Sequence, residues 1–361
     1  MKRRTFLTGG LAAAGFAVLR HGRVAAGQVD RSKLSKTLLF NSYGGAWQKA
    51  LTEAALKPFE DEYGVKIEQE SHGNEAEVLA KMRAAGSSAF DVITLNESGL
   101  YIGVRQGLFE ELRLENLPNF KNLLPVLQTP PYDPGPGVHS IPDVYGANAV
   151  VYNTKFVEKP DSWGVCWDPR YKGRISVRDA AIYRVFLTAL YVGQDPNNIT
   201  DAEKVYEALR RQRPLVLKYW SGTTEMQNLV ANGEAWVGEF VGGRTLILKQ
   251  QGVPVDYVIP KEGARGYVDS VCIAKGSPRR YTAEVLLNYM LEPNVATRIA
   301  ELTKYPHCLD PSKVPVSESV KTLPDYDPTG TLSRFRFTNY QYMEQHRAAW
   351  EKAWTQIKVG G

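Results

Sequence analysis

Cysteine is scarce in this 361-residue chain, and Cys166, Cys272 and Cys308 stand far apart. Three separated cysteines make no disulfide framework, so we expect buried thiols, although the sequence leaves open whether any two of them pair. Cys-x-x-Cys and His-x-x-x-His spacings are both missing. Their absence disfavours a zinc site, and we expect neither a metal nor another cofactor.

The motifs of several enzyme classes are missing as well. The chain has no Gly-x-Ser-x-Gly elbow, no Gly-x-x-x-x-Gly-Lys-Ser/Thr loop and no Gly-x-Gly-x-x-Gly after a strand. These absences remove the usual signatures of a hydrolase, a nucleotide hydrolase and a dinucleotide enzyme. We therefore expect a protein that is not an enzyme, with an exported enzyme kept as the weaker alternative.

Acidic residues are absent from the first 26 positions, which carry Lys2, Arg3, Arg4, Arg20 and Arg23. These five account for the whole difference between 44 basic and 39 acidic residues. The rest of the chain is electrically balanced, so it lacks the basic footprint that nucleic-acid binding requires. No nucleic-acid partner is expected.

Residues 1–26 have the organisation of a signal peptide. The basic start is followed by an apolar run over 7–19, too short as a helix to span a bilayer core of about 30 Å. Small residues Val24-Ala25-Ala26 supply a cleavage site. Arg3-Arg4 before Phe6-Leu7 resembles a twin-arginine signal, which predicts periplasmic export; a generic secretory signal or a membrane anchor is the alternative. Beyond this run no stretch approaches 18 apolar residues.

Strand and helix patterns alternate in the mature chain. Apolar runs predict strands over 37–41, 65–68 and 90–95, and helical spacing predicts helices over 46–63 and 74–85. Such alternation is typical of a parallel sheet flanked by helices, which is an α/β fold. Further helices are expected over 202–211 and 281–291, and further strands over 234–241 and 255–259.

Two long extended runs, 145–153 and 266–273, are candidates for strands that cross between two lobes. We expect residues 35–148 plus 262–305 to form the first lobe and residues 149–261 plus 306–361 to form the second. Two lobes joined by two crossovers leave a cleft, and small ligands bind preferentially in clefts at domain interfaces.

Four segments give the chain its resemblance to a known family. They are Ile141-Pro142-Asp143-Val144-Tyr145-Gly146 with Tyr152-Asn153; Ser162-Trp163 with Tyr171-Lys172-Gly173; Pro260-Lys261-Glu262-Gly263 with Tyr267-Val268-Asp269-Ser270; and Leu291-Glu292-Pro293 with Tyr305-Pro306. In this order and spacing they resemble the spermidine/putrescine-binding proteins of ABC importers, which are related to iron(III)- and thiamine-binding proteins.

The resemblance implies a two-lobed periplasmic-binding-protein fold of type II that closes over a ligand in the periplasm. It also implies delivery to an ABC permease of the inner membrane with its cytoplasmic ATPase. We expect a monomer that binds a small amine-bearing solute, either polyamine-like or a zwitterionic amino-acid derivative. The iron and thiamine classes are the alternatives, and iron is disfavoured because the chain has no Tyr-Tyr pair.

The family's binding residues carry over unevenly. Asp269 falls on the amine-binding aspartate, Tyr267 replaces an aromatic wall residue, and Tyr43 matches an aromatic residue of the first loop. Arg184 stands where the family has a glutamate, and Asp179 is the nearest acid. An arginine would repel an ammonium group and favour an acid group, unless Arg184 pairs with Asp179 or Glu239 and never touches ligand. Ser98 and Glu239 complete the candidate site as positions for polar contacts.

Overall fold

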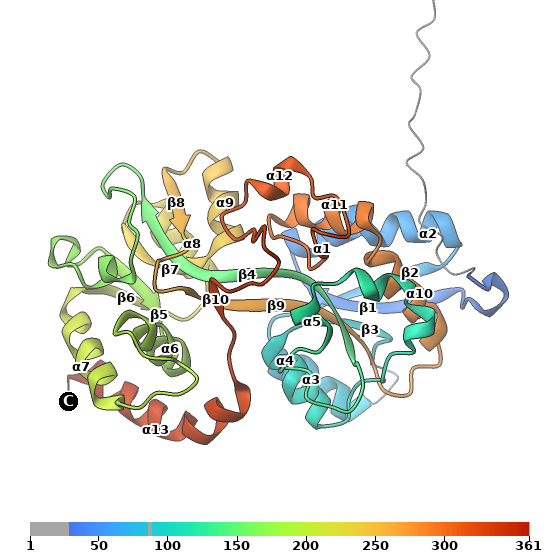
Figure 1. The fold of residues 1–361 in the computed structure, drawn as a ribbon, viewed down its shortest axis with the longest axis horizontal. Helices are drawn as coiled ribbons and strands as arrows, with labels where there is room; N and C mark the ends of the chain where they lie inside the picture. The colour runs from blue at the N-terminus through green and yellow to red at the C-terminus, as the bar shows by residue number, and fades with distance from the viewer. Residues whose placement is uncertain (1–28, 86–88, 361) are drawn as a thin grey trace, which may run out of the picture.

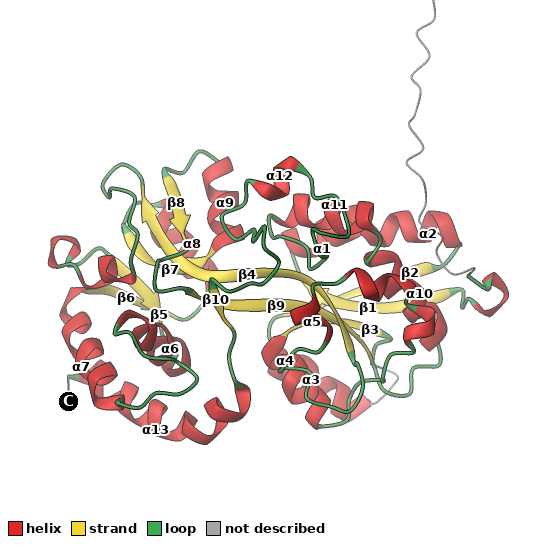
Figure 2. Ribbon diagram, in the orientation of Figure 1, coloured by secondary structure: helices red, strands yellow, loops and turns green. Residues whose placement is uncertain are grey.

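The fold is that of two α/β lobes lying side by side, joined by long strands through the middle of the molecule (Figure 1). It is described by a computed structural model over residues 29–85 and 89–360. The predicted signal peptide, residues 1–26, lies outside the described residues. Helices cover the sheet in both lobes (Figure 2). In the described part of the chain, no helix is long and apolar enough to cross a membrane.

The first lobe is built around three parallel strands, of which two are largely buried and the third, at the edge of the sheet, is polar and mostly exposed. Both faces of the two buried strands, β1 and β3, are covered, which explains why their apolar residues form continuous runs rather than alternating ones. The elements are β1 (Thr37–Tyr43), α1 (Ala46–Leu51), α2 (Lys57–Tyr63), β2 (Lys66–His72), α3 (Glu75–Ala85), β3 (Val92–Asn96), α4 (Glu97–Arg105), α5 (Pro125–Gln128), α10 (Arg280–Met290), α11 (Pro293–Thr303) and α12 (Glu318–Lys321).

The second lobe repeats the arrangement with another parallel set of three strands. In it β5 pairs with β6 on one side and with β7 on the other. The elements are β5 (Ile175–Arg178), α6 (Ala181–Tyr191), α7 (Ala202–Gln212), β6 (Val216–Trp220), α8 (Thr223–Ala231), β7 (Val237–Val241), α9 (Gly242–Gln250), β8 (Val255–Val258) and α13 (Tyr340–Val359).

The lobes are connected through β4 (Ser140–Asn153) and β9 (Ala264–Ile273), which pair antiparallel. In the sheet order β2-β1-β3-β9-β4-β7-β5-β6 they stand between the two parallel sets. These are the two crossovers predicted over 145–153 and 266–273, so the prediction of an α/β fold with two crossover strands is confirmed. A short strand, β10 (Phe335–Arg336), pairs with β9.

The predicted helix over 46–63 is present but interrupted. Residues Thr52–Leu56 form a π-helical turn between α1 and α2. The helix ends where Gly64 adopts φ 70°, a left-handed conformation that suits glycine. The three cysteines are buried free thiols, as expected from their number and separation.

A third connection, residues 304–339, runs between the lobes beside β4 and β9. Its first part packs on the first lobe. Leu124 donates its backbone N–H to the carbonyl of Cys308, and Asp310 donates its backbone N–H to the carbonyl of Asn122. The predicted division placed 306–361 with the second lobe. That division stays a proposal, and these contacts indicate that the boundary lies later in the segment.

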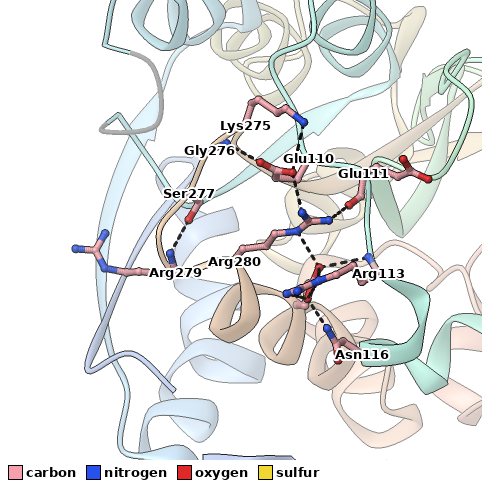
Figure 3. A network of polar contacts seen from close by, with 10 residues as sticks. Glu110, Glu111, Arg113, Asn116, Lys275, Gly276, Ser277, Arg279 and Arg280 are labelled. Atoms are coloured by element: carbon pink, nitrogen blue, oxygen red, sulfur yellow. Dashed lines mark hydrogen bonds and ion pairs between the residues drawn. The ribbon is translucent and has the colours of Figure 1, made fainter. Parts of the chain in front are cut away.

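One buried carboxylate ties α10 to the segment 113–116 of the first lobe. Glu284 is fully buried and accepts from Arg113 Nε at 3.0 Å, Asn116 Nδ2 at 2.6 Å and Arg280 Nε at 3.1 Å. Figure 3 shows Arg113, Asn116 and Arg280 converging in this network. Because several donors surround a desolvated acid, the network fixes α10, which packs against β9.

Candidate functional site

A cavity of about 280 Å³ lies between the lobes and takes its lining from both. It lies where the strands of the two parallel sets end: Tyr43, Asn96, Arg178 and Trp220 are the last residues of β1, β3, β5 and β6. Ligands of open α/β sheets bind at the carboxyl ends of the strands, so the position is the expected one for a ligand site. The lining residues used below are Tyr43, Trp47, Glu75, Glu97, Ser98, Arg178, Tyr183, Trp220, Arg244, Arg265, Tyr267, Asp269 and Tyr305.

The first lobe presents an acidic wall. Asp269, from β9, is 7% exposed and accepts a hydrogen bond from Tyr43 Oη at 3.1 Å. Glu75, the first residue of α3, lies 3.4 Å from the same hydroxyl. One hydroxyl carries one proton, so it cannot fully satisfy both carboxyl groups. Acceptors therefore exceed donors at this end of the cavity, which suits a ligand that brings several N–H groups.

Burial shifts the titration of these acids. It raises the pKa of Asp269 well above 3.8, and the charge of nearby Glu97 adds to the effect. Burial also raises the pKa of Glu75, an effect that the positive charge of Arg178 opposes. A cation placed between the two carboxyl groups would relieve both shifts.

The third acid of the cavity is already neutralised by the protein. Glu97, the first residue of α4, accepts from Arg265 Nη2 at 2.8 Å and from the backbone N–H of Val268 at 3.1 Å. Arg265 is also bonded to Asn148 Oδ1 at 3.3 Å. Both charged groups are buried, so this pair is a fixed floor of the cavity, and Asp269 and Glu75 are left as the acids available to a ligand.

The second lobe presents arginines and aromatic rings. Arg178 lies over the rings of Tyr183, at 4.2 Å, and Trp220, at 5.0 Å. Arg244, from the first turn of α9, is an exposed lining residue. Among residues 29–85 and 89–360, neither Arg178 nor Arg244 has a carboxylate within ion-pair distance. The cavity is thus polarised, with available acids on one lobe and available cations on the other.

Aromatic side chains complete the first lobe's wall. The ring centre of Tyr43 lies 5.8 Å from that of Trp47, and the ring centre of Trp47 lies 6.1 Å from that of Tyr305. Tyr305 in turn meets the ring of Tyr267 at 6.1 Å with a T-shaped geometry. Such a series of ring faces and edges gives apolar contact to an aliphatic chain and cation–π contact to an ammonium group.

The candidate residues chosen from the sequence divide into two groups. Tyr43, Ser98, Tyr267 and Asp269 all line the cavity. Their contact with ligand stays a prediction, but the fold brings them together from β1, α4 and β9. The other three candidates, described next, lie outside the lining.

Arg184, Asp179 and Glu239 do not line the cavity, which corrects their proposed role. Arg184 is 2% exposed, donates to Gln212 Oε1 at 2.8 Å and lies 3.7 Å from Glu239 Oε2. Asp179 lies against α13, where it accepts from Trp354 Nε1 at 2.9 Å and pairs with Lys358 at 2.9 Å. Because Arg184 and Glu239 neutralise one another inside the second lobe, the alternative in which Arg184 pairs with Glu239 is the correct one.

Replacing Arg184 therefore should affect stability rather than ligand choice. We expect Arg184→Met to lower the free energy of unfolding by about 2–3 kcal/mol, since Glu239 would stay buried with fewer partners. Adding Glu239→Gln to this variant should restore part of the loss, because no unpaired charge would remain. Urea unfolding and ligand titration of both variants check this. An altered ligand preference with unchanged stability would place Arg184 at the ligand after all.

The sequence reasoning missed Trp47, Glu75, Arg178, Tyr183 and Tyr305. A usable signal existed for four of them: Arg178 ends a strand, and the other three, Trp47, Glu75 and Tyr183, lie in the first turn of a helix that follows a strand, at the carboxyl edge of a parallel set. Tyr305 carries no such signal, because it follows α11 and reaches the cavity through tertiary packing.

No group of three or more histidine, cysteine or acidic side chains is placed to hold a metal ion in the described part of the chain. The chemistry of the cavity is instead that of hydrogen bonding, opposite charges and ring contacts. Such a site binds and orients a solute, and both lobes contribute contacts to it.

Comparison with known proteins identifies the family of the chain. The family model for bacterial extracellular solute-binding proteins matches residues 54–328. The chain belongs to this family. The resemblance drawn from the sequence is thereby confirmed, and the protein is a solute-binding protein. The family consists of binding proteins rather than enzymes.

Relatives with assigned names cover most of the chain. The spermidine/putrescine-binding periplasmic protein 1 of Haemophilus influenzae is 31% identical over 265 residues, which are 72% of this chain and 73% of that protein. The corresponding protein of Escherichia coli is 28% identical over 266 residues, 72% of this chain and 75% of its own length. A solved spermidine/putrescine ABC transporter substrate-binding protein from Streptococcus pneumoniae superposes with a TM-score of 0.77 at 21% identity, covering 90% of this chain and 99% of that one. This superposition supports the two-lobed fold.

Proposed function

We propose that this solute-binding protein is the periplasmic receptor of an ABC importer and captures a small zwitterion. The protonated amine of the solute is bound by Asp269 and Glu75 on the first lobe. Its acid group, a carboxylate or a phosphonate, is bound by Arg178 and Arg244 on the second lobe. The observation that carries the proposal is the polarity of the cavity, with its available acids on one lobe and its available arginines on the other.

Charge complementarity at both ends explains why a zwitterion is favoured over a diamine. Each end of a zwitterion gains a charge-assisted hydrogen bond, and the planar guanidinium fork suits an acid group bidentately. A diamine would place its second ammonium group beside two arginines, and like charges in a desolvated site repel strongly. The relatives are named for binding spermidine and putrescine, which are amines, and this supports an amine group on the ligand proposed here.

Closure couples this recognition to delivery. A ligand that touches both lobes stabilises the closed state by its contacts to the second lobe, so the closed form reports occupancy to a permease. The proposal includes export by the twin-arginine-type signal in 1–26, a monomeric receptor, and an inner-membrane ABC permease with its ATPase as partners. The relatives are named as periplasmic proteins, which supports the compartment.

A charge series of four-carbon solutes tests the function. We expect 4-aminobutanoate to bind one to one in calorimetry and to raise the melting temperature. We expect 1,4-diaminobutane and butanedioate to bind at least about tenfold more weakly, since each places one like charge beside the wrong wall. Recovery of the chemically unchanged solute separates a receptor from an enzyme. Tighter binding of the diamine would contradict the proposed ligand class.

Affinity for the amine end should depend on pH. The ionised carboxylate of Asp269 is the form that binds an ammonium group, and its pKa is raised in the unliganded protein. As the pH falls toward that raised pKa a proton competes with the ligand, so affinity should fall and binding should release a proton. Calorimetry in buffers of different ionisation enthalpy measures this release. Affinity that increases on acidification would oppose the prediction.

The raised pKa of Asp269 gives the stability of the unliganded protein the opposite pH dependence to that of ligand affinity. The folded state holds the Asp269 proton more tightly than the unfolded chain does. Hence the contribution of Asp269 to the free energy of unfolding is largest below pH 3.8, the ordinary pKa of an aspartate. This contribution is lost as the pH rises toward the raised pKa of the folded state. Ligand should offset this loss, because the bound amine compensates the ionised carboxylate.

A further inference from the structure

Two aromatic rings that the second lobe contributes to the cavity lie against cations of the protein itself. Arg178 lies 4.2 Å from the ring centre of Tyr183 and 5.0 Å from that of Trp220. Arg265 lies 4.6 Å from the same Tyr183 ring. A pair of aromatic rings facing a cavity is the usual binding place for an ammonium group. Here a guanidinium group of the chain stands in that place.

Arg178 is held there by its local structure. It ends β5, and its backbone N–H donates to Glu239 Oε2 at 3.3 Å, so the strand end is fixed to the buried interior of the second lobe. Its guanidinium lines the cavity and has no ion-pair partner in the described part of the chain. The ring contacts orient the plane of the group while its N–H donors remain available to a ligand.

We propose that Arg178 is the specificity-determining residue of the site: a tethered cation that fills the second lobe's aromatic ammonium site and thereby requires an acid group at the far end of the ligand. This inference rests on the proposed function and adds the mechanism of its selectivity. One side chain does two things. It supplies the donors for the acid group, and it denies the Tyr183 and Trp220 rings to a second ammonium group.

The proposal predicts that removing this cation reverses ligand preference. In Arg178→Met an unbranched apolar side chain replaces the guanidinium that lies over the rings of Tyr183 and Trp220, so the Trp220 ring loses its cation, while Arg265 still lies over Tyr183. Binding of 4-aminobutanoate should weaken by at least about tenfold, the loss expected for a charge-assisted hydrogen bond. Binding of 1,4-diaminobutane should strengthen by about tenfold, because repulsion is removed and a cation–π contact is gained. Arg178→Lys should keep the wild-type order of preference.

A matched control is available in the same lobe. Arg174 lies 4.9 Å from the ring centre of Trp236, so it makes the same kind of contact, but it is exposed and does not line the cavity. Arg174→Met should leave both affinities within about twofold of wild type. Melting temperatures without ligand show whether each variant is folded. If the methionine variant fails to fold, Arg178→Gln replaces it in the same titrations.

The outcomes separate this inference from the function on which it rests. Preference of the wild-type protein for 4-aminobutanoate supports the proposed function whatever the variants do. If Arg178→Met then keeps the wild-type ratio of the two affinities, Arg178 is not the specificity residue and this inference is overturned. If the wild-type protein prefers the diamine, both the proposed ligand class and this inference fail. Reversal in Arg178→Met, with no reversal in Arg178→Lys or Arg174→Met, supports the inference.

Discussion

Asp269→Asn should weaken binding of the amine-bearing solute by about 2–5 kcal/mol, roughly 30-fold to several thousand-fold. The asparagine side chain keeps the shape of the aspartate and removes its charge. Asparagine also replaces one of the two acceptor oxygens by an NH2 group, which donates hydrogen bonds, while Tyr43 still needs an acceptor at this position. The ligand amine therefore loses both a charge partner and an acceptor. Calorimetric titration with 4-aminobutanoate measures the loss.

Stability separates this effect from misfolding. Because burial of a carboxyl group without a cation is unfavourable, unliganded Asp269→Asn should melt at the same temperature as wild type or higher. Glu70→Gln is the matched control, since Glu70 is an exposed acid of β2 whose partner is Lys81 on α3. It should change affinity by less than about twofold. Wild-type affinity in Asp269→Asn would remove Asp269 from the binding site.

Glu284→Ala should lower the free energy of unfolding by about 3–5 kcal/mol, the range for removing one partner from a buried charged network. Glu284 is fully buried, and Arg113 donates to both of its oxygens. Without the carboxylate, Arg113 and Arg280 would face one another near Asn116 with their shared acceptor removed (Figure 3). Urea unfolding measures the change.

The matched control for this prediction is a surface ion pair of the same lobe. Glu53 pairs with Arg298 at 2.5 Å, and both side chains are about half exposed. Glu53→Gln should cost less than about 1 kcal/mol, because solvent screens exposed pairs. Ligand affinity should remain unchanged in both variants when measured well below their melting temperatures. A loss in Glu284→Ala no larger than in Glu53→Gln would show that the buried network contributes little.

Much of the fold could be predicted because its signals are local. Apolar runs located β1 and β3, helical spacing located α3 and α7, and two extended runs located the crossovers β4 and β9. The π-helical turn at Thr52–Leu56 had no signal, since apolar spacing changes little across it. The strand β6 was not predicted because it is partly exposed, and α13 was missed because its buried face is narrow within a polar sequence.

The site was harder to predict, because its composition depends on whether each charged side chain points into the cavity or into the interior of its lobe. Asp269 was found through the motif Tyr267-Val268-Asp269-Ser270, which lies within β9. Arg184 was misplaced because motif alignment gives a position in the sequence but not the direction of a side chain. At the start of α6, Arg184 turns into the lobe's interior toward Glu239, whereas Arg178, six positions earlier, ends β5 at the cavity.

The most direct test of the account is a crystal structure of the protein with 4-aminobutanoate bound. The account predicts that the amine lies within hydrogen-bond distance of Asp269 and Glu75 and that the carboxylate lies on Arg178, with Arg244 closing over it. A reversed ligand, with its carboxylate beside Asp269, or a ligand bound outside this inter-lobe cavity, would contradict the polarity on which the account depends.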